Sequence, residues 1–104
     1  MRAAGGRPGA AAARLLPEDP AVHNNLGLAL LQLGRRNEAI GQLQTVLRLA
    51  PDSADGHFSM GRALLGVPAD YRAALREFET AARLRPDWAA AQSAVGQLRA
   101  RLGP

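Results

Sequence analysis

Two histidines have the widest chemical repertoire in this chain, because imidazole serves both as a general base and as a metal ligand. His23 and His57 lie 34 positions apart in a chain of 104 residues. The chain contains no cysteine, which excludes thiolate catalysis and zinc–thiolate sites. A metal site needs three or four converging ligands, and neither histidine belongs to a recognisable metal-binding motif. We therefore predict structural roles for both histidines, with no metal and no cofactor.

Other catalytic arrangements are also missing from the sequence. Glu77 and Glu79 are two positions apart, so on a helix they face different sides and cannot form a carboxylate pair. No nucleophile elbow and no phosphate-binding glycine loop is present. The sequence therefore predicts a protein that is not an enzyme.

The elements that position these residues are helices, and the clearest pair spans residues 20–51. In its first half, apolar residues follow the i, i+3, i+4, i+7 spacing of an amphipathic helix, on a face formed by His23, Leu26, Gly27, Leu30 and Leu33. The second half repeats this spacing with Ala39, Ile40, Leu43, Val46 and Leu47. Gly34 suits the left-handed residue that closes a helix, and Pro51 cannot continue one. We expect two antiparallel helices joined by a tight turn.

The same pattern then occurs a second time. The first-helix residues recur 34 positions later as His57, Met60, Gly61 and Leu64. The second-helix residues recur 35 positions later, with Ala74, Phe78, Ala81 and Pro86 in place of Ala39, Leu43, Val46 and Pro51. A fixed period of this size indicates stacked helix pairs. Glycine costs a helix about 1 kcal/mol relative to alanine. Its recurrence at positions 27, 61 and 96 therefore predicts close approach of the paired helices.

These residues resemble the tetratricopeptide repeat (TPR) family. That family's first helix carries an aromatic residue, then Leu-Gly, then an aromatic residue or leucine. Its second helix carries a small residue, an aromatic residue or leucine, another small residue and then proline. This chain departs from the pattern with His for Trp at 23 and 57, Val46 for alanine, and one extra residue in the second turn. The resemblance implies an all-α fold of antiparallel helix-turn-helix repeats stacked as a short right-handed α-solenoid.

The predicted organisation is one domain behind a short tail. We expect a flexible tail at 1–9 and a TPR-like domain at 10–104, which divides into a partial repeat at 10–17, repeats at 20–53 and 54–88, and a C-terminal capping helix at 89–104. Predicted helix caps are Asp19, Ser53, Asp70 and Asp87, and Trp88 is predicted to pack over a neighbouring helix end. Because about three repeats are usually needed for stability, we expect self-association through exposed end helices, or a longer parent chain.

Charge and hydropathy bear on partners and location. The formal net charge is +4, from thirteen arginines and no lysine. The arginines are scattered and often lie near acidic residues, and the helices lack stacking aromatics, so the sequence argues against nucleic-acid binding. No apolar run approaches the roughly 18 residues of a membrane span, and no signal peptide is evident. These patterns favour a cytoplasmic location.

The resemblance also implies a binding surface, because the first helices of successive TPR repeats line a concave groove that receives a peptide. The corresponding residues are Asn24, Leu28, Leu31, Gln32, Asp55, Phe58, Arg62, Leu65, Ser93, Gln97 and Arg101. Leu28, Leu31, Phe58 and Leu65 would form an apolar patch with Arg62 at its edge. For Leu31 and Leu65, filling gaps between repeats is an equally good interpretation. The positions where related modules clamp a C-terminal carboxylate hold Asn24, Leu28, Ser59, Ala90 and Ala94, so that clamp is missing.

Three functions remain open on the sequence alone. The first is a non-catalytic module that binds a protein or peptide partner in the groove, with Arg62 selecting an acidic group. The second is the TPR arm or a fragment of a larger protein, such as a glycosyltransferase-type enzyme or a secretion or pilus assembly factor. The third, nucleic-acid binding through arginine, has the least support.

Overall fold

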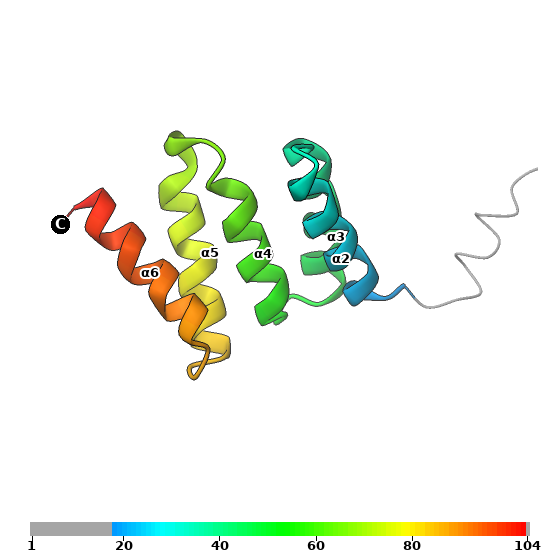
Figure 1. Cartoon of the computed structure of the whole chain (residues 1–104). Coiled ribbons are helices and arrows are strands. Elements are labelled where there is room, and N and C mark those ends of the chain that lie inside the picture. Colours follow the sequence, from blue (N-terminus) through cyan, green and yellow to red (C-terminus); the bar gives the residue numbers. More distant parts are fainter. Residues whose placement is uncertain (1–17, 104) are drawn as a thin grey trace, which may run out of the picture.

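The computed structural model of the chain describes residues 18–103, apart from the side chain of Pro68. This part contains α2 (Pro20–Gln32), α3 (Arg36–Leu49), α4 (Ala54–Leu64), the short 3-10 helix η1 (Pro68–Asp70), α5 (Tyr71–Leu84) and α6 (Ala89–Leu102) (Figure 1). Residues 18–103 contain no strand, and the predicted all-α repeat fold is confirmed. The predicted tail and partial repeat at 1–17 lie outside the described residues.

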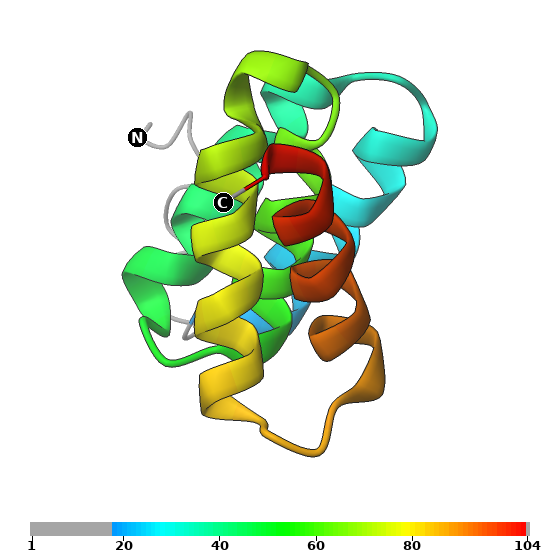
Figure 2. The same cartoon turned by 90° about the vertical axis from the view of Figure 1, so that its left-hand side faces the viewer.

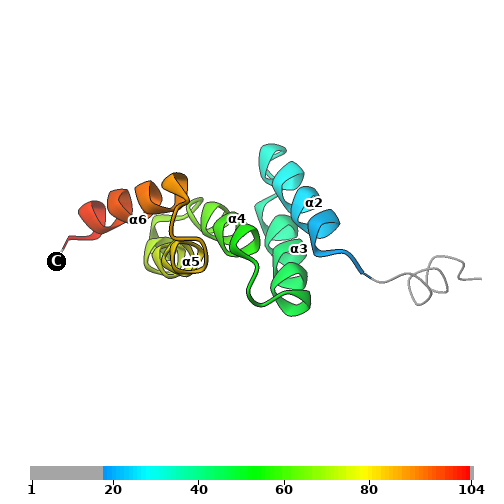
Figure 3. The same cartoon turned by 90° about the horizontal axis from the view of Figure 1, so that it is seen from below.

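The helices form two layers. Successive helices run antiparallel, with α2, α4 and α6 along one side of the array and α3 and α5 along the other (Figure 3). Seen from the α6 end, α5 and α6 lie side by side in front of the earlier helices (Figure 2). The array therefore has a first-helix side and a second-helix side, as a helical solenoid requires.

Two of the predicted helix starts are confirmed. The Asp19 carboxylate accepts a hydrogen bond from the Ala21 N–H at 2.9 Å, and Ser53 Oγ accepts one from the Gly56 N–H at 2.9 Å. Each satisfies a backbone donor that the first turn of a helix leaves unpaired. Gly34 has φ of +77°, the left-handed conformation predicted for the turn after α2.

The two other predicted caps are wrong. Asp70 is the N-cap residue of α5, but its side chain makes no capping hydrogen bond, because the carboxylate pairs with Arg36. Asp87 lies one residue too early in the turn, and α6 has Trp88 at its N-cap, again without a side-chain capping bond. At Asp70, a contact between repeats has taken precedence over local capping.

The core follows the repeat. Buried residues on α3 are Ala39, Leu43 and Val46, and their equivalents on α5 are Ala74, Phe78 and Ala81. The extra residue in the second turn has therefore left the helix faces unchanged, as predicted. One cluster joins Leu43 and Val46 to Met60 and Ala63 on α4, and the other joins Ala74 and Phe78 to Val95 and Leu98 on α6. Each second helix packs against the first helix of the next repeat.

The predicted apolar face of α2 is only partly right. Gly27 and Leu30 are buried, but Leu26 is 44% exposed and Leu33 is 70% exposed. The equivalents of Leu26 are Met60 and Val95, which are buried against the preceding helices α3 and α5. No helix precedes α2 within residues 18–103, and Leu33 is the C-cap residue at the helix end.

Close helix approach is confirmed at two of the three recurring glycines. A Cβ at Gly27 would lie 2.9 Å from Leu43 Cδ2, and one at Gly61 would lie 2.8 Å from the Phe78 ring. A Cβ at Gly96 would meet nothing within 4 Å. The prediction is wrong at Gly96 because, in the described part of the chain, no second helix follows α6 to cover that face.

Arg36 joins the two repeats, a role that sequence analysis missed. It begins α3, and its guanidinium reaches across to the next repeat. Nε donates to the Ala63 carbonyl oxygen at 2.8 Å, and Nη2 donates to Asp70 Oδ2 at 2.7 Å. Ala63 lies in the last turn of α4, where carbonyl groups lack helical partners. Arg36 therefore caps α4 and pairs with the residue that precedes α5.

We expect Arg36→Met to lower the free energy of unfolding by about 1–2 kcal/mol, because it removes two hydrogen bonds from a charged donor. Urea denaturation followed by circular dichroism measures the change. Arg76→Met, at an exposed position on α5, is the matched control and should stay within about 0.5 kcal/mol of the original chain. Asp70→Asn should cost less in the Arg36→Met background than alone. Equal effects of the two arginine substitutions would contradict the proposed role.

Candidate partner-binding surface

The predicted groove residues all lie on α2, α4 and α6 or at their ends, on the first-helix side of the array. We call this set the first-helix face. Its members Asn24, Leu28, Leu31 and Phe58 are half-buried, and Gln32, Asp55, Arg62, Leu65, Ser93, Gln97 and Arg101 are exposed. The structure therefore leaves polar and charged groups open to solvent beside partly covered apolar ones. Their contact with a partner stays a prediction.

Two leucines of this face differ in how they are covered. Leu31 packs against the cluster that contains Leu43 and Met60, so it helps to fill the space between repeats. Leu65 is 39% exposed and borders a pocket. Of the two, Leu65 offers more apolar surface to a partner.

Phe58 has a packing role in the structure. Its ring meets Phe78 edge-on at 5.2 Å between centroids and lies 4.5 Å from the Trp88 ring. The Arg85 guanidinium lies 4.5 Å from the centre of the same Trp88 ring. The predicted packing of Trp88 is confirmed. Because Phe58 is already half-buried by these neighbours, its substitution would test folding and binding together.

Charge on the first-helix face is predominantly positive. The Asp55 carboxylate pairs with Arg85 Nη1 at 3.4 Å. Arg62 and Arg101 form no ion pair with any carboxylate of residues 18–103. The Arg101 guanidinium instead lies 5.5 Å from the centre of the Tyr71 ring. Two guanidinium groups on this face therefore remain available to an acidic partner.

A pocket of about 250 Å³ opens between α5 and α6. It is lined by Leu65, Tyr71, Phe78, Ala94, Gln97, Leu98 and Arg101. Leu65, Gln97 and Arg101 were predicted groove residues, whereas Tyr71 and Leu98 were missed. Tyr71 could have been noticed because it stands 35 positions after Arg36, at the first position of its helix.

A second hollow lies over the turn at 34–38 and is formed by polar side chains. Within it, Arg35 Nε donates to Glu38 Oε2 at 2.6 Å. This hydrogen bond, and the attraction between the two charges, raise the pKa of Arg35 above its ordinary value. Since arginine is already charged at neutral pH, this shift does not change the charge of Arg35 there.

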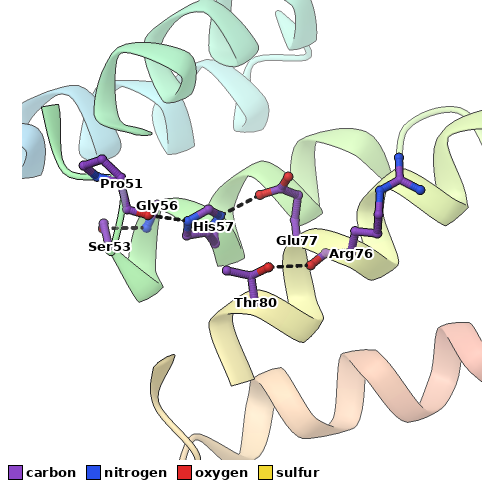
Figure 4. Close-up of polar contacts among 7 residues, drawn as sticks. All are labelled: Pro51, Ser53, Gly56, His57, Arg76, Glu77 and Thr80. Atoms are coloured by element: carbon purple, nitrogen blue, oxygen red, sulfur yellow. Dashed lines mark hydrogen bonds and ion pairs between the residues drawn. The ribbon is translucent and has the colours of Figure 1, made fainter. Parts of the chain in front are cut away.

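The two histidines link helices within their repeats. His57 Nδ1 lies 2.7 Å from Glu77 Oε1 on α5, and Nε2 donates to the Pro51 carbonyl oxygen at 2.7 Å (Figure 4). At the equivalent place, His23 Nδ1 donates to Gln42 Oε1 on α3 at 2.8 Å. Among residues 18–103, no group of three His, Asp or Glu side chains could hold a metal ion. Each ring therefore ties two helices of its repeat together through a hydrogen bond.

Comparison with known proteins supports the class of fold and gives one family match within the chain. Antiparallel helix pairs repeating at a fixed interval define a helical repeat protein. A sequence model described as tetratricopeptide repeat matches residues 20–53. Residues 20–53 therefore match a tetratricopeptide repeat, and the helical repeat fold of residues 18–103 is that of TPR proteins. The comparison with curated proteins found no match.

Three similar solved structures are TPR proteins. MamA from Desulfovibrio magneticus RS-1, from its residue 41 to its end, has a TM-score of 0.72 and 23% identity over 83% of this chain and 48% of that chain. A MamA mutant has a TM-score of 0.70 and 25% identity over 84% of this chain and 63% of that one. YrrB has a TM-score of 0.70 and 24% identity over 86% and 45% respectively. This chain therefore spans about half the length of the structures it resembles.

None of the helices described between residues 18 and 103 is long and apolar enough to cross a membrane.

Proposed function

We propose that this chain is a non-catalytic interaction module that binds a peptide segment of a partner protein on its first-helix face. The observation that carries the proposal is that Arg62 and Arg101, which pair with no carboxylate of residues 18–103, lie on the same side of the array as partly covered apolar side chains. Apolar contact supplies binding energy, and the guanidinium groups favour a segment that carries acidic residues.

Charge distribution supports a protein partner over nucleic acid. Residues 18–103 hold ten arginines against nine acidic residues, so this part of the chain is close to neutral. Four of those arginines are paired with carboxylates, Arg35, Arg36, Arg85 and Arg99. A surface that binds nucleic acid through phosphates needs a denser basic patch.

One structural neighbour, YrrB, is described as a TPR protein with an unusual peptide-binding site. At 24% identity this likeness bears on the fold, so the proposal rests on the residues of the first-helix face in this chain.

The test is selection of peptides from a random library on the intact chain, followed by affinity measurement with fluorescence polarisation. We expect the selected peptides to contain acidic residues. Arg62→Glu should weaken their binding about tenfold, because it replaces attraction by like-charge repulsion. Arg72→Glu, on the second-helix side, is the matched control and should change affinity less than about twofold. Failure to select any peptide, or equal effects of the two variants, would contradict the proposal.

A further inference from the structure

We propose that the pocket between α5 and α6 is the anchor site of this surface, taking one large apolar side chain of the partner peptide while Arg101 contacts an acidic side chain beside it. This inference rests on the proposed function and names the chemistry of the bound segment. The apolar patch predicted from the sequence lies on α2 and on α4 with its C-cap residue Leu65. The pocket moves the predicted point of attachment to the other end of the array.

The pocket has an apolar floor. Phe78 is 1% exposed and Leu98 is 5% exposed, so both are held in place by the core around them. Leu65, Tyr71 and Ala94 complete its apolar lining. An apolar side chain that enters the pocket would leave water and pack against carbon atoms that are already fixed in position. Burial of this kind contributes most to binding.

The size of the pocket decides between a side chain and a larger ligand. An engineered protein cavity of about 150 Å³ accepts benzene, whereas pockets for drug-sized ligands and cofactors measure about 300–1,000 Å³. At about 250 Å³, this pocket admits one leucine, methionine or phenylalanine side chain and is small for a cofactor. A peptide that presents a single apolar anchor fits best.

Arg101 supplies the second part of the recognition. Its guanidinium lies 5.5 Å from the centre of the Tyr71 ring and pairs with no carboxylate of residues 18–103. Its neighbour on the same helix, Arg99, is engaged by Glu79 at 2.8 Å. The face of an aromatic ring attracts a guanidinium without using its N–H donors in hydrogen bonds. A carboxylate one to three residues from the apolar anchor could therefore pair with Arg101.

The repeat explains why the pocket occurs here. Arg36 begins α3, and its guanidinium donates to the carbonyl oxygen of Ala63 in the next repeat. Its side chain also packs against Gly66, where an added Cβ would lie only 2.6 Å from Arg36 Cδ. Tyr71 begins α5 at the equivalent position, and Leu98 is the equivalent of Ala63. Tyr71 has no guanidinium to reach across to α6, and a pocket lies between these residues. The contact that closes the first junction is absent from the second.

The experiment uses the intact chain and fluorescein-labelled octapeptides in a Gly-Ser background. Each carries Leu or Phe with Asp one to three residues later, and matched peptides carry Ala for the apolar residue or Asn for Asp. Ala94→Leu should fill the pocket and weaken binding of the apolar-acidic peptides about 30-fold. Ala89→Leu, on another face of α6, should leave binding unchanged.

Arg101→Gln should weaken the Asp peptides about threefold and remove the preference for Asp over Asn, because an exposed ion pair contributes little more than this. Arg83→Gln, an exposed arginine of α5, is the charge control. Thermal melts by circular dichroism establish that each variant is folded. If Ala94→Leu unfolds, Gln97→Phe at the exposed rim serves as the second blocking variant.

The outcomes separate this inference from the proposed function. Loss of binding with the blocking variant and of acid preference with Arg101→Gln would support the anchor site. If peptides bind more weakly to Arg62→Glu but bind the pocket-blocking variant and Arg101→Gln normally, the anchor site is overturned and the proposed function stands. If neither the designed octapeptides nor a random library yields a binder, both proposals fail.

Discussion

Phe78→Ala is expected to lower the free energy of unfolding by about 3–5 kcal/mol, the usual cost of removing a fully buried phenylalanine. Phe78 is 1% exposed and stands at the centre of the cluster that joins α5 to α6. It also touches Phe58 edge-on, and its ring fills the space that Gly61 leaves on α4. One substitution therefore removes contacts to two neighbouring helices, α4 and α6, at once.

This loss is a large fraction of the total stability, because residues 18–103 contain few repeats. Native domains are typically stable by about 5–15 kcal/mol, and an array near the lower limit of repeat number lies at the low end. Chemical denaturation in urea should show a marked fall in the midpoint, with a substantial unfolded fraction at 25 °C. Leu84→Ala, on the same helix but 38% exposed, is the control and should cost less than about 1 kcal/mol. A cost for Phe78→Ala near that of the control would rule out the assigned core.

Gly61→Val is expected to cost about 3 kcal/mol, although valine favours a helix more than glycine does. The added Cβ would lie 2.8 Å from Phe78 Cε1 and Cζ. Carbon atoms prefer a separation of about 3.5–4.0 Å. Phe78 is 1% exposed and packs against Val95 and Leu98, so its ring must shift against α6 to make room. Differential scanning calorimetry should show a fall of many degrees in the melting temperature.

Gly96 provides the matched control, since it occupies the same repeat position without a neighbour within 4 Å. Gly96→Val should change the free energy of unfolding by no more than about 0.5 kcal/mol. The combination of Gly61→Val with Phe78→Leu should recover part of the loss, because the smaller side chain makes room. Equal costs at Gly61 and Gly96 would show that helix propensity, not packing, governs this position.

Much of the architecture follows from the sequence alone. The recurrence of His23, Leu26, Gly27 and Leu30 as His57, Met60, Gly61 and Leu64 sets the repeat length, and apolar spacing within each copy defines the helix faces. Gly34 and the Asp19 and Ser53 caps mark boundaries through local chemistry. These features can be read because backbone hydrogen bonding and side-chain periodicity depend on near neighbours in the chain.

What depends on distant neighbours required the tertiary structure. The Asp70 side chain reads as a helix cap, yet it pairs with Arg36, 34 positions earlier. Leu26 and Gly96 both carry the repeat pattern. In the described part of the chain, however, no helix precedes α2 to cover Leu26, and no second helix follows α6 to cover Gly96.

The pocket is likewise a property of packing. It exists because Tyr71 stands where the preceding junction has Arg36, and because α6 places Leu98 and Arg101 opposite it. Sequence periodicity determined which faces of the helices meet. Whether a junction is closed or open was decided by the tertiary structure. It depends on the volume and the length of side chains that come from elements far apart in the chain.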